Sequence, residues 1–564
     1  MTSGCGRRVW LCLTVVWTFG LAGCGVPGSV GQADTYGLDF SLPSGSQTAG
    51  ALIFAVDGVN AEVFQQMLQA GELPAIRKYF VDRGLYCPRA VAVVPSVTLP
   101  SFTSVVTGRL PGHHGVTGVD WFDRQRVLYR DYCTISQKNA LDGDYTAPTI
   151  YEQFPRRSTF SVFLQPHRGA TTFIEQRLTG APTFFFRWYE FLDRLTLLRL
   201  GIVLDAARLD RAFPAVTAVY LLAPDFAAYC HGVDSPQYRQ ALRHTDRQIG
   251  RVLGDVARAG LLDKVHLALV SDHGMTQAVR HFDVAEFLRR QVGLKLASRQ
   301  LWESTPPEQR LQYYQQYQVV SYGSGRRYVA LCLRKPIRKD SQIVGMEPWP
   351  IRPTPQDLER YPSGDGLDDL PSVLAAQEAF EALAYAAGPN RVRVRTKAGE
   401  VEFRQDAGPG GEIVYLLRSG TDPLGYKAEV PPDAMDGAPM DERQWLAATA
   451  DTDYPDLPAQ ILAYFRAPRA GDIIVFAAPG WDFDRSHKAG HGGVSPADMY
   501  VPLLLAGPGV PHSQVHHART VDLMPTLLVL LSRPVPPGLD GRSLLPAPAP
   551  ADTQPRPPSR PTDR

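Results

Sequence analysis

Short apolar runs, many of them rich in β-branched residues, recur along this chain and are separated by stretches with helical periodicity. Apolar runs of about four to eight residues are typical of strands that are buried on both faces, as in a parallel sheet. In the clearest helical stretch, Leu242, Ile249 and Val256 fall on one stripe, and Gly260 follows in the position of a helix-ending glycine. This alternation predicts a doubly wound α/β fold with a mostly parallel sheet and helices on both faces. The runs that we expect in this sheet are ALIFAVD (51–57), STFSVFL (158–164), AVTAVYLL (215–222), KVHLALVSD (264–272), DIIVFAAP (472–479) and YVPLLLAGP (500–508).

The alternation breaks between residues 286 and 470, where proline, glycine and charged residues are frequent. Within this region RVRVRTKAGEVEFRQ alternates apolar and polar residues, which predicts a hairpin, and EIVYLLR can extend it. We therefore expect an inserted α+β subdomain that is rich in strands. The predicted organisation is a signal peptide (1–23), a flexible tether (24–48), a catalytic core in two parts (49–285 and 471–545), the insertion (286–470) and a disordered Pro-rich tail (546–564).

The first 24 residues have the features of an export signal. Arg7 and Arg8 precede an apolar segment, 9–22, that is shorter than the ~20 residues needed to span a bilayer as a helix. The residues Leu-Ala-Gly-Cys (21–24) resemble the lipobox of bacterial lipoproteins. We therefore expect lipidation of Cys24 and a lipid-anchored protein in the periplasm, with the outer membrane favoured. An ordinary secretory signal is the alternative.

The charge balance of the chain is almost even, with 58 basic and 57 acidic residues. A protein that binds a nucleic-acid duplex is typically basic, so we expect no such partner. The apolar content of 44% is ordinary for a soluble globular protein, and the chain is long enough for a large core.

Acids and histidines stand at the ends of several predicted strands. Asp57 closes one run, Asp225 follows another, the pair Asp272-His273 closes a third, and His491 precedes the last one. In an open α/β sheet functional groups collect at the carboxyl ends of the strands. A single aspartate there is typical of a helix cap, but converging carboxylates and imidazoles form a ligand set for Zn²⁺ or Mn²⁺.

The segment PSVTLPSFTSVVTGRLPGHHG (95–115) follows another apolar run and is rich in hydroxyl groups. Alone, it fits a polar turn that leads from a strand into a helix. Beside two divalent ions ~4 Å apart, one of its hydroxyls can act as the nucleophile of an in-line displacement at phosphorus.

Taken together, these segments resemble the alkaline phosphatase superfamily, specifically its type I phosphodiesterase/nucleotide pyrophosphatase branch. The resemblance covers roughly residues 50–285 and 470–545 and implies a phosphoester hydrolase, more a diesterase than a monoesterase, that acts on a small phosphoester or nucleotide-like substrate. The motifs that carry it are FAVDGV with Asp57, the hydroxyl-rich segment with Thr98, APDFAAYCHG with Asp225, VSDHGM with Asp272 and His273, and GHGG with His491.

The resemblance also implies the roles of these residues. Thr98 is the expected nucleophile, which forms a phosphothreonine intermediate, and the cofactors are two divalent metal ions, zinc with manganese as the alternative. One ion is expected between Thr98, Asp57, Asp272 and His273, and the other at Asp225 and His491.

The chain departs from the family pattern at two positions. Tyr229 stands where a histidine ligand of the second ion belongs, so either Tyr229 binds as a phenolate, or His231 replaces it, or the second site is weak or empty. Ser101 stands where nucleotide-cleaving members often carry an asparagine that holds a phosphoryl oxygen, a role that a serine can fill with one shorter donor. The alternatives to a hydrolase are a single-metal or non-catalytic substrate-binding lipoprotein of this fold and an envelope phosphoryl-group transferase.

Overall fold

The computed structural model describes residues 49–134, 137–175, 187–210, 212–340, 342–364, 366–406, 410–484 and 486–546. The predicted signal peptide, the tether with Cys24 and the tail after residue 546 lie outside these ranges and stay predictions. No helix in the described residues is long and apolar enough to cross a membrane.

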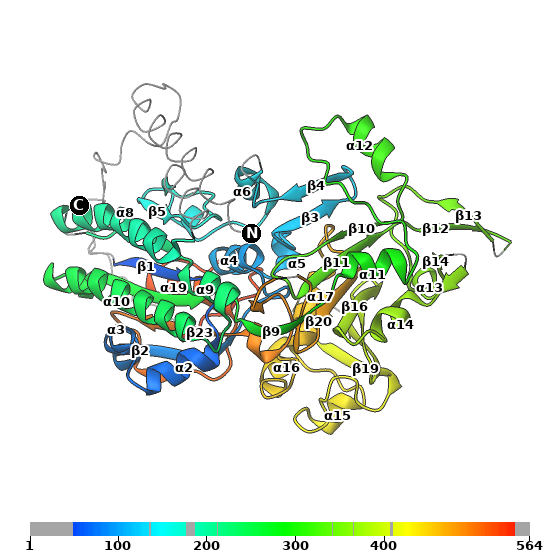
Figure 1. The fold of residues 1–564 in the computed structure, drawn as a ribbon. Coiled ribbons are helices and arrows are strands. Elements are labelled where there is room, and N and C mark those ends of the chain that lie inside the picture. The colour runs from blue at the N-terminus through cyan, green and yellow to red at the C-terminus, as the bar shows by residue number, and fades with distance from the viewer. Residues whose placement is uncertain are drawn as a thin grey trace, which may run out of the picture.

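The main sheet has eight strands and lies in the left half of Figure 1. Its central strand β1 pairs in parallel with β7 and β8, and β7 continues in parallel to β5, whereas β23 is antiparallel to both of its neighbours. The predicted α/β class with a mostly parallel sheet is therefore confirmed. In spatial order the strands are β24 (Ser513–Gln514), β2 (Gly84–Val91), β23 (Tyr500–Ala506), β8 (Val265–Ser271), β1 (Gly50–Val56), β7 (Val216–Leu221), β5 (Thr159–Val162) and β6 (Thr172–Ile174).

Helices cover both faces of this sheet. Successive side chains of β1 pack alternately against the helices of one face and of the other. Leu52 and Phe54 pack into one apolar cluster, whereas Ile53 and Ala55 pack into another on the opposite face. Every residue of β1 is buried, which explains its continuous apolar sequence. The first face carries α2 (Ala61–Gln69), α3 (Pro74–Tyr79), α8 (Tyr189–Asp210) and α10 (Pro236–Arg258), and the second carries α4 (Thr98–Thr107) and α19 (Leu523–Leu530).

Helix α10 has the predicted apolar stripe, and the predicted glycine follows its C-terminal end. Leu242, Ile249 and Val256 are buried against the sheet. The side chain of Ser235 accepts a hydrogen bond from the Tyr238 backbone N–H at the first turn, and Gly260 follows the helix with a φ of 69°. A left-handed residue at this point is favourable for glycine because it has no Cβ.

A second sheet of seven strands forms the core of the other half of the molecule. The predicted hairpin is confirmed as β17 and β18, and the segment that can extend it is β19. The prediction that DIIVFAAP belongs to the main sheet is wrong. It forms β20, which is antiparallel to β11 and β16, and its full burial on both faces gives it the same apolar pattern as a main-sheet strand. In order the strands are β10 (Val319–Tyr322), β11 (Tyr328–Leu333), β20 (Ile473–Ala477), β16 (Phe380–Gly388), β17 (Arg391–Thr396), β18 (Gly399–Gln405) and β19 (Ile413–Gly420).

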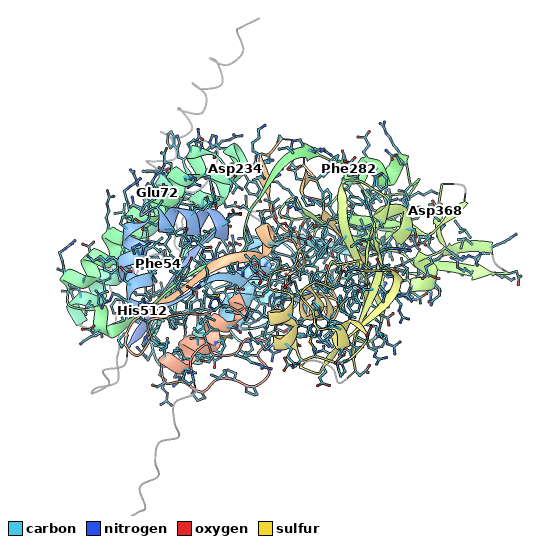
Figure 2. The ribbon with its side chains drawn as sticks, turned by 90° about the horizontal axis from the view of Figure 1, so that it is seen from below. Phe54, Glu72, Asp234, Phe282, Asp368 and His512 are labelled. Carbon is cyan, nitrogen blue, oxygen red and sulfur yellow. The ribbon has the colours of Figure 1, made fainter. Side chains whose placement is uncertain are left out.

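Smaller elements complete the fold. Figure 2 shows how far the two halves extend, with Phe54 and His512 toward one end and Asp368 toward the other. The small strands are β3 (Asp120–Asp123) with β4 (Leu128–Asp131), β12 (Pro336–Lys339) with β13 (Gln342–Met346), β14 (Tyr361–Ser363) with β15 (Gly366–Asp368), and β9 (Thr276–His281) between β21 (Gly480–Asp482) and β22 (Ala489–Gly490). The remaining helices are α5 (Pro111–His114), α6 (Leu141–Asp144), α9 (Ala223–His231), α11 (Val284–Arg290), α12 (Pro307–Tyr314), α13 (Pro355–Leu358), α14 (Leu370–Ala375), α15 (Pro432–Met435), α16 (Glu442–Ala448), α17 (Leu457–Tyr464) and α18 (Pro496–Met499).

A buried arginine joins the two halves. Arg519, between β24 and α19, is fully buried and pairs with Asp456, which precedes α17, through Nε to Oδ2 at 2.6 Å and Nη2 to Oδ1 at 2.7 Å. Nη1 also lies 3.2 Å from a carboxylate oxygen of Glu442. This two-bond pairing holds the main-sheet half against the helices of the second half.

Candidate active site

The candidate site lies at the carboxyl ends of the main-sheet strands, on the side that faces the second sheet. Asp57 directly follows β1, Asp272 directly follows β8, and Asp225 lies in the first turn of α9 after β7. Thr98 is the first residue of α4. These four residues lie at or beside a cavity of ≈ 1170 Å³ whose far wall is formed by residues around β3, β4 and the β10–β11 turn.

The start of α4 is open toward the cavity. Its N-cap residue, Val97, has no side chain that can accept a hydrogen bond from the first turn. The backbone N–H groups of Thr98 and Leu99 are therefore available to an anion, which the helix dipole also favours, whereas Pro100 has no N–H and the Ser101 N–H donates to the Val97 carbonyl. The Thr98 hydroxyl oxygen lies at this point, 3.2 Å from Nε2 of His273.

Asp57, Asp272 and His273 direct ligand atoms to one point. Nε2 of His273 lies 3.2 Å from Oδ1 of Asp57 and 3.3 Å from Oδ2 of Asp272. The other oxygen of each carboxylate is already occupied, because Asp57 Oδ2 accepts from the Tyr220 hydroxyl and Asp272 Oδ1 accepts from the N–H groups of Gly58 and His273. The two converging oxygens have no hydrogen-bond partner in the protein.

The imidazole of His273 has the tautomer that a metal ligand needs. Its Nδ1 donates to the carbonyl oxygen of Gly274 at 2.9 Å, so Nε2 is the nitrogen that presents a lone pair when the imidazole is neutral. Two buried carboxylate oxygens without partners and one imidazole lone pair, with a hydroxyl beside them, are a donor set that fits a divalent ion such as Zn²⁺.

The electrostatics of the site also favour a cation. Burial, followed by the negative charge of Asp57, raises the pKa of both Asp225 and Asp272 well above the usual range of a carboxyl group. Burial disfavours a charged His273, but the carboxylates of Asp272 and Asp57 outweigh it and raise the pKa of this imidazole to about 9. The carboxylates therefore repel one another at close range, and a divalent ion relieves this repulsion.

The second group, Asp225 and His491, is less complete. Oδ1 of Asp225 has no partner, and the ring of His491 stacks on that of His273 with 3.4 Å between the ring centroids. Nδ1 of His491 donates to the carbonyl oxygen of Ser96, which leaves Nε2 as the acceptor. The Tyr229 hydroxyl lies 2.6 Å from this Nε2 and donates to it. The lone pair that would bind a second ion is thus occupied by a proton of Tyr229.

The structure does not bring His231 to the site, and the role of Ser101 stays a prediction. Helix α9 continues without an insertion to His231, which is exposed at its last turn, so the longer loop that would place this histidine as a ligand does not form. Ser101 is fully buried, and its hydroxyl has no hydrogen-bond partner. Ser101 and Phe102 both lie about one helical turn after Thr98 on α4, and Phe102 lines the cavity.

Two residues at the site were not predicted from the sequence. Tyr220, at the end of β7, orients Asp57 through its hydroxyl. Arg326, in the turn between β10 and β11, places its guanidinium 4.7 Å from the ring centroid of Tyr229. Neither belongs to a motif, and Arg326 lies in the region predicted to be an insertion without chemistry.

The family model described as type I phosphodiesterase / nucleotide pyrophosphatase matches residues 51–340 of this chain. The chain belongs to this family. The resemblance that the motifs carried is therefore confirmed, and the family supports the expectation of a phosphoester hydrolase.

Curated relatives of this phosphodiesterase-family chain match it over a limited part of their length. The mouse ectonucleotide pyrophosphatase/phosphodiesterase family member 1 is 26% identical over 237 residues, which are 42% of this chain and 25% of the relative. The venom phosphodiesterase of Macrovipera lebetinus is 26% identical over 243 residues, with 42% and 26% covered. The chain thus spans about a quarter of the length of these relatives.

Solved structures show the same fold. An inactive form of murine ectonucleotide pyrophosphatase/phosphodiesterase 5 in complex with AMP has a TM-score of 0.53 at 15% identity and covers 87% of this chain and 96% of its own. The human protein of the same name has a TM-score of 0.52 at 16% identity. The likeness extends over both halves of the molecule.

Proposed function

We propose that this protein is a metal-dependent phosphodiester hydrolase that works through a covalent phosphothreonine at Thr98. The observation that carries the proposal is the position of the Thr98 hydroxyl, at the open start of α4 and 3.2 Å from the imidazole of His273, beside two carboxylate oxygens without partners. Family membership supports the reaction class. The proposed setting is the bacterial cell envelope, with the chain anchored through Cys24.

Asp57, Asp272 and His273 would hold a divalent ion, zinc or alternatively manganese, which would supply a Lewis acid that lowers the pKa of an adjacent hydroxyl. The Thr98 hydroxyl loses its proton to solvent, and its oxygen forms a bond to phosphorus as the bond to the leaving oxygen breaks in line; the leaving group departs as an anion or takes up a proton from water. The N–H groups at the start of α4 orient non-bridging oxygens. Water then attacks the phosphothreonine, so a phosphomonoester leaves and the Thr98 hydroxyl is restored.

Cleavage assays test this proposal directly. We expect bis(p-nitrophenyl) phosphate and the p-nitrophenyl ester of thymidine 5′-monophosphate to be cleaved faster than p-nitrophenyl phosphate. Chelation followed by dialysis should remove the activity, and added Zn²⁺ or Mn²⁺ should restore it. A protein that binds metal but cleaves none of these esters would contradict the hydrolase and favour the non-catalytic alternative.

The resemblance predicts two metal ions, and binding of the second ion depends on Tyr229. Because the Tyr229 hydroxyl donates to His491 Nε2, we infer that the Asp225–His491 pair holds an ion weakly in this chain. We expect Tyr229→His to raise the bound zinc from one to two ions per chain, since a second imidazole then faces Asp225. Metal analysis after gel filtration measures this.

Tyr229→Phe is the matched control for this substitution. It frees the lone pair of His491 without adding a ligand, and Asp225 and His491 alone are too few ligands for a second ion, so the zinc content should stay at one ion per chain. Two ions in the unsubstituted protein would contradict the inference and indicate that Tyr229 binds as a phenolate.

A further inference from the structure

The cavity beside Thr98 is strongly acidic for a site that takes an anionic ester. Besides the carboxylates that converge on the metal position, it is lined by Asp120, Asp131, Glu175, Asp283 and Asp484. Among the described residues that line it, Arg326 is the only lysine or arginine. Among these described lining residues, a phosphoryl group that enters the cavity therefore meets one arginine and no lysine.

Arg326 lies at the end of the site formed by Asp225 and His491, where the ligand set for a second ion is incomplete. Its guanidinium lies 4.7 Å from the ring centroid of Tyr229, and the hydroxyl of the same tyrosine contacts His491. The ring of His491 stacks on the ring of His273, whose Nε2 lies 3.2 Å from the Thr98 hydroxyl oxygen. The positive charge of Arg326 thus faces the Asp225–His491 end of the site.

The guanidinium of Arg326 has two partners in the protein, Asp484 and the side chain of Tyr229, which do not use all five of its donors. Nη1 forms an ion pair with Asp484, which lines the cavity. Oδ2 of Asp484 also lies 3.3 Å from Nδ1 of His487. Nε is buried and has no hydrogen-bond partner. Because a guanidinium has five N–H donors in a planar fork, a pairing with one carboxylate orients the group without using all of them.

The backbone holds Arg326 in place against His491. Arg326 has a φ of 71°, a left-handed conformation that is disfavoured for a residue with a side chain, and it follows Gly325 with a φ of 68°. A Cβ on Gly325 would lie 2.6 Å from the carbonyl oxygen of His491. The His491 N–H donates to the Gly325 carbonyl at 2.7 Å, and the Phe483 N–H donates to the Arg326 carbonyl at 2.7 Å. These backbone hydrogen bonds therefore fix the position of Arg326 relative to His491.

We propose that Arg326 binds phosphoryl oxygens of the substrate and of the phosphate product, and that it supplies at the Asp225–His491 end the positive charge that a second ion would supply. Guanidinium groups bind phosphate through charge-assisted hydrogen bonds, often two at a time. The inference rests on the proposed function for the identity of the anion. A purely structural arginine that stacks on Tyr229 and pairs with Asp484 is the competing explanation.

The test measures the affinity of the zinc-loaded protein for inorganic phosphate by calorimetry, together with kcat and KM for bis(p-nitrophenyl) phosphate. We expect Arg326→Gln to weaken phosphate binding by roughly 10- to 100-fold, because a hydrogen bond to a charged group is lost. Arg326→Lys keeps the positive charge but loses the planar arrangement of donors. Its phosphate affinity should lie between those of Arg326→Gln and the unsubstituted protein. Zinc content and Tm, measured for each variant, should match those of the unsubstituted protein.

Arg280→Gln is the matched control. Arg280 also lies over an aromatic ring, 5.3 Å from the centroid of Trp481, and pairs with a carboxylate, Glu378, at 2.6 Å, but it is exposed and does not line the cavity. We expect its phosphate affinity and KM to equal those of the unsubstituted protein.

The outcomes separate this inference from the proposed function. Unchanged phosphate affinity in Arg326→Gln, or equal weakening in Arg280→Gln, would overturn the role of Arg326 whether or not the protein cleaves diesters. Weakened phosphate binding in Arg326→Gln alone would support that role even if no ester is cleaved, in which case only the proposed hydrolase fails.

Discussion

Thr98→Ala is expected to lower kcat for bis(p-nitrophenyl) phosphate by on the order of 10³-fold or more, since loss of a nucleophile in enzymes with covalent intermediates has effects of this size or larger. The substitution removes the oxygen that attacks phosphorus. Alanine is compatible with the first turn of a helix, and Thr98 is only partly buried, so α4 should remain intact. Steady-state kinetics and the Tm of the same preparation measure both effects.

Thr98→Ser is the control for this prediction. It keeps the hydroxyl and loses only a methyl group, so it should retain measurable turnover and form the same covalent intermediate. Quenching with acid during turnover should trap a p-nitrophenyl phosphoryl group on residue 98 in the unsubstituted protein and not in Thr98→Ala. Turnover of Thr98→Ala within tenfold of the unsubstituted protein would show that water attacks the diester directly and would overturn the covalent mechanism.

Arg519→Met is expected to destabilise the protein by about 3–5 kcal/mol, because it leaves the buried carboxylate of Asp456 without its charged partner. Both side chains are fully buried, and the pair connects the two halves of the molecule through two short hydrogen bonds. Methionine approximates the volume of the arginine stem, so the loss reports on the charge rather than on packing. Urea unfolding followed by far-UV circular dichroism measures the change.

Arg89→Ala is the matched control for the buried pair. Arg89 in β2 also pairs across the two halves, with Asp451 at 2.8 Å, but the two side chains are 45% and 64% exposed. An exposed ion pair contributes about 1 kcal/mol or less. An effect of Arg519→Met as small as that of Arg89→Ala would show that Asp456 is solvated or neutral in the folded protein.

The sequence predicted the main sheet because burial on both faces leaves a continuous apolar pattern. The same argument explains the error at 472–479, since β20 is equally buried in the middle of another sheet. Periodicity reports how a strand is buried and not which strands it pairs with. The pairing of β20 with β11 and β16 depends on contacts between residues far apart in the chain.

The candidate site was predicted in part. Asp57, Asp272 and His273 stand in motifs at strand ends, so their convergence followed from the fold. The choice between Tyr229 and His231 depended on whether α9 continues as a helix, and the sequence left that open. Arg326 had no sequence signal, because its position results from a left-handed turn that is fixed by backbone hydrogen bonds to a distant segment.

The order of strands in the main sheet has a consequence for how the protein is made. Strand β2 leads into α4 and Thr98, yet its partners in the sheet are β23 and β24, which begin at Tyr500 and Ser513. Until those later residues are present, β2 has neither partner, and an unpaired strand edge invites association with other chains. The threonine helix therefore reaches its final position only after β23 and β24 are available to pair with β2. A nascent chain stalled before residue 500 should bind chaperones and carry no assembled site.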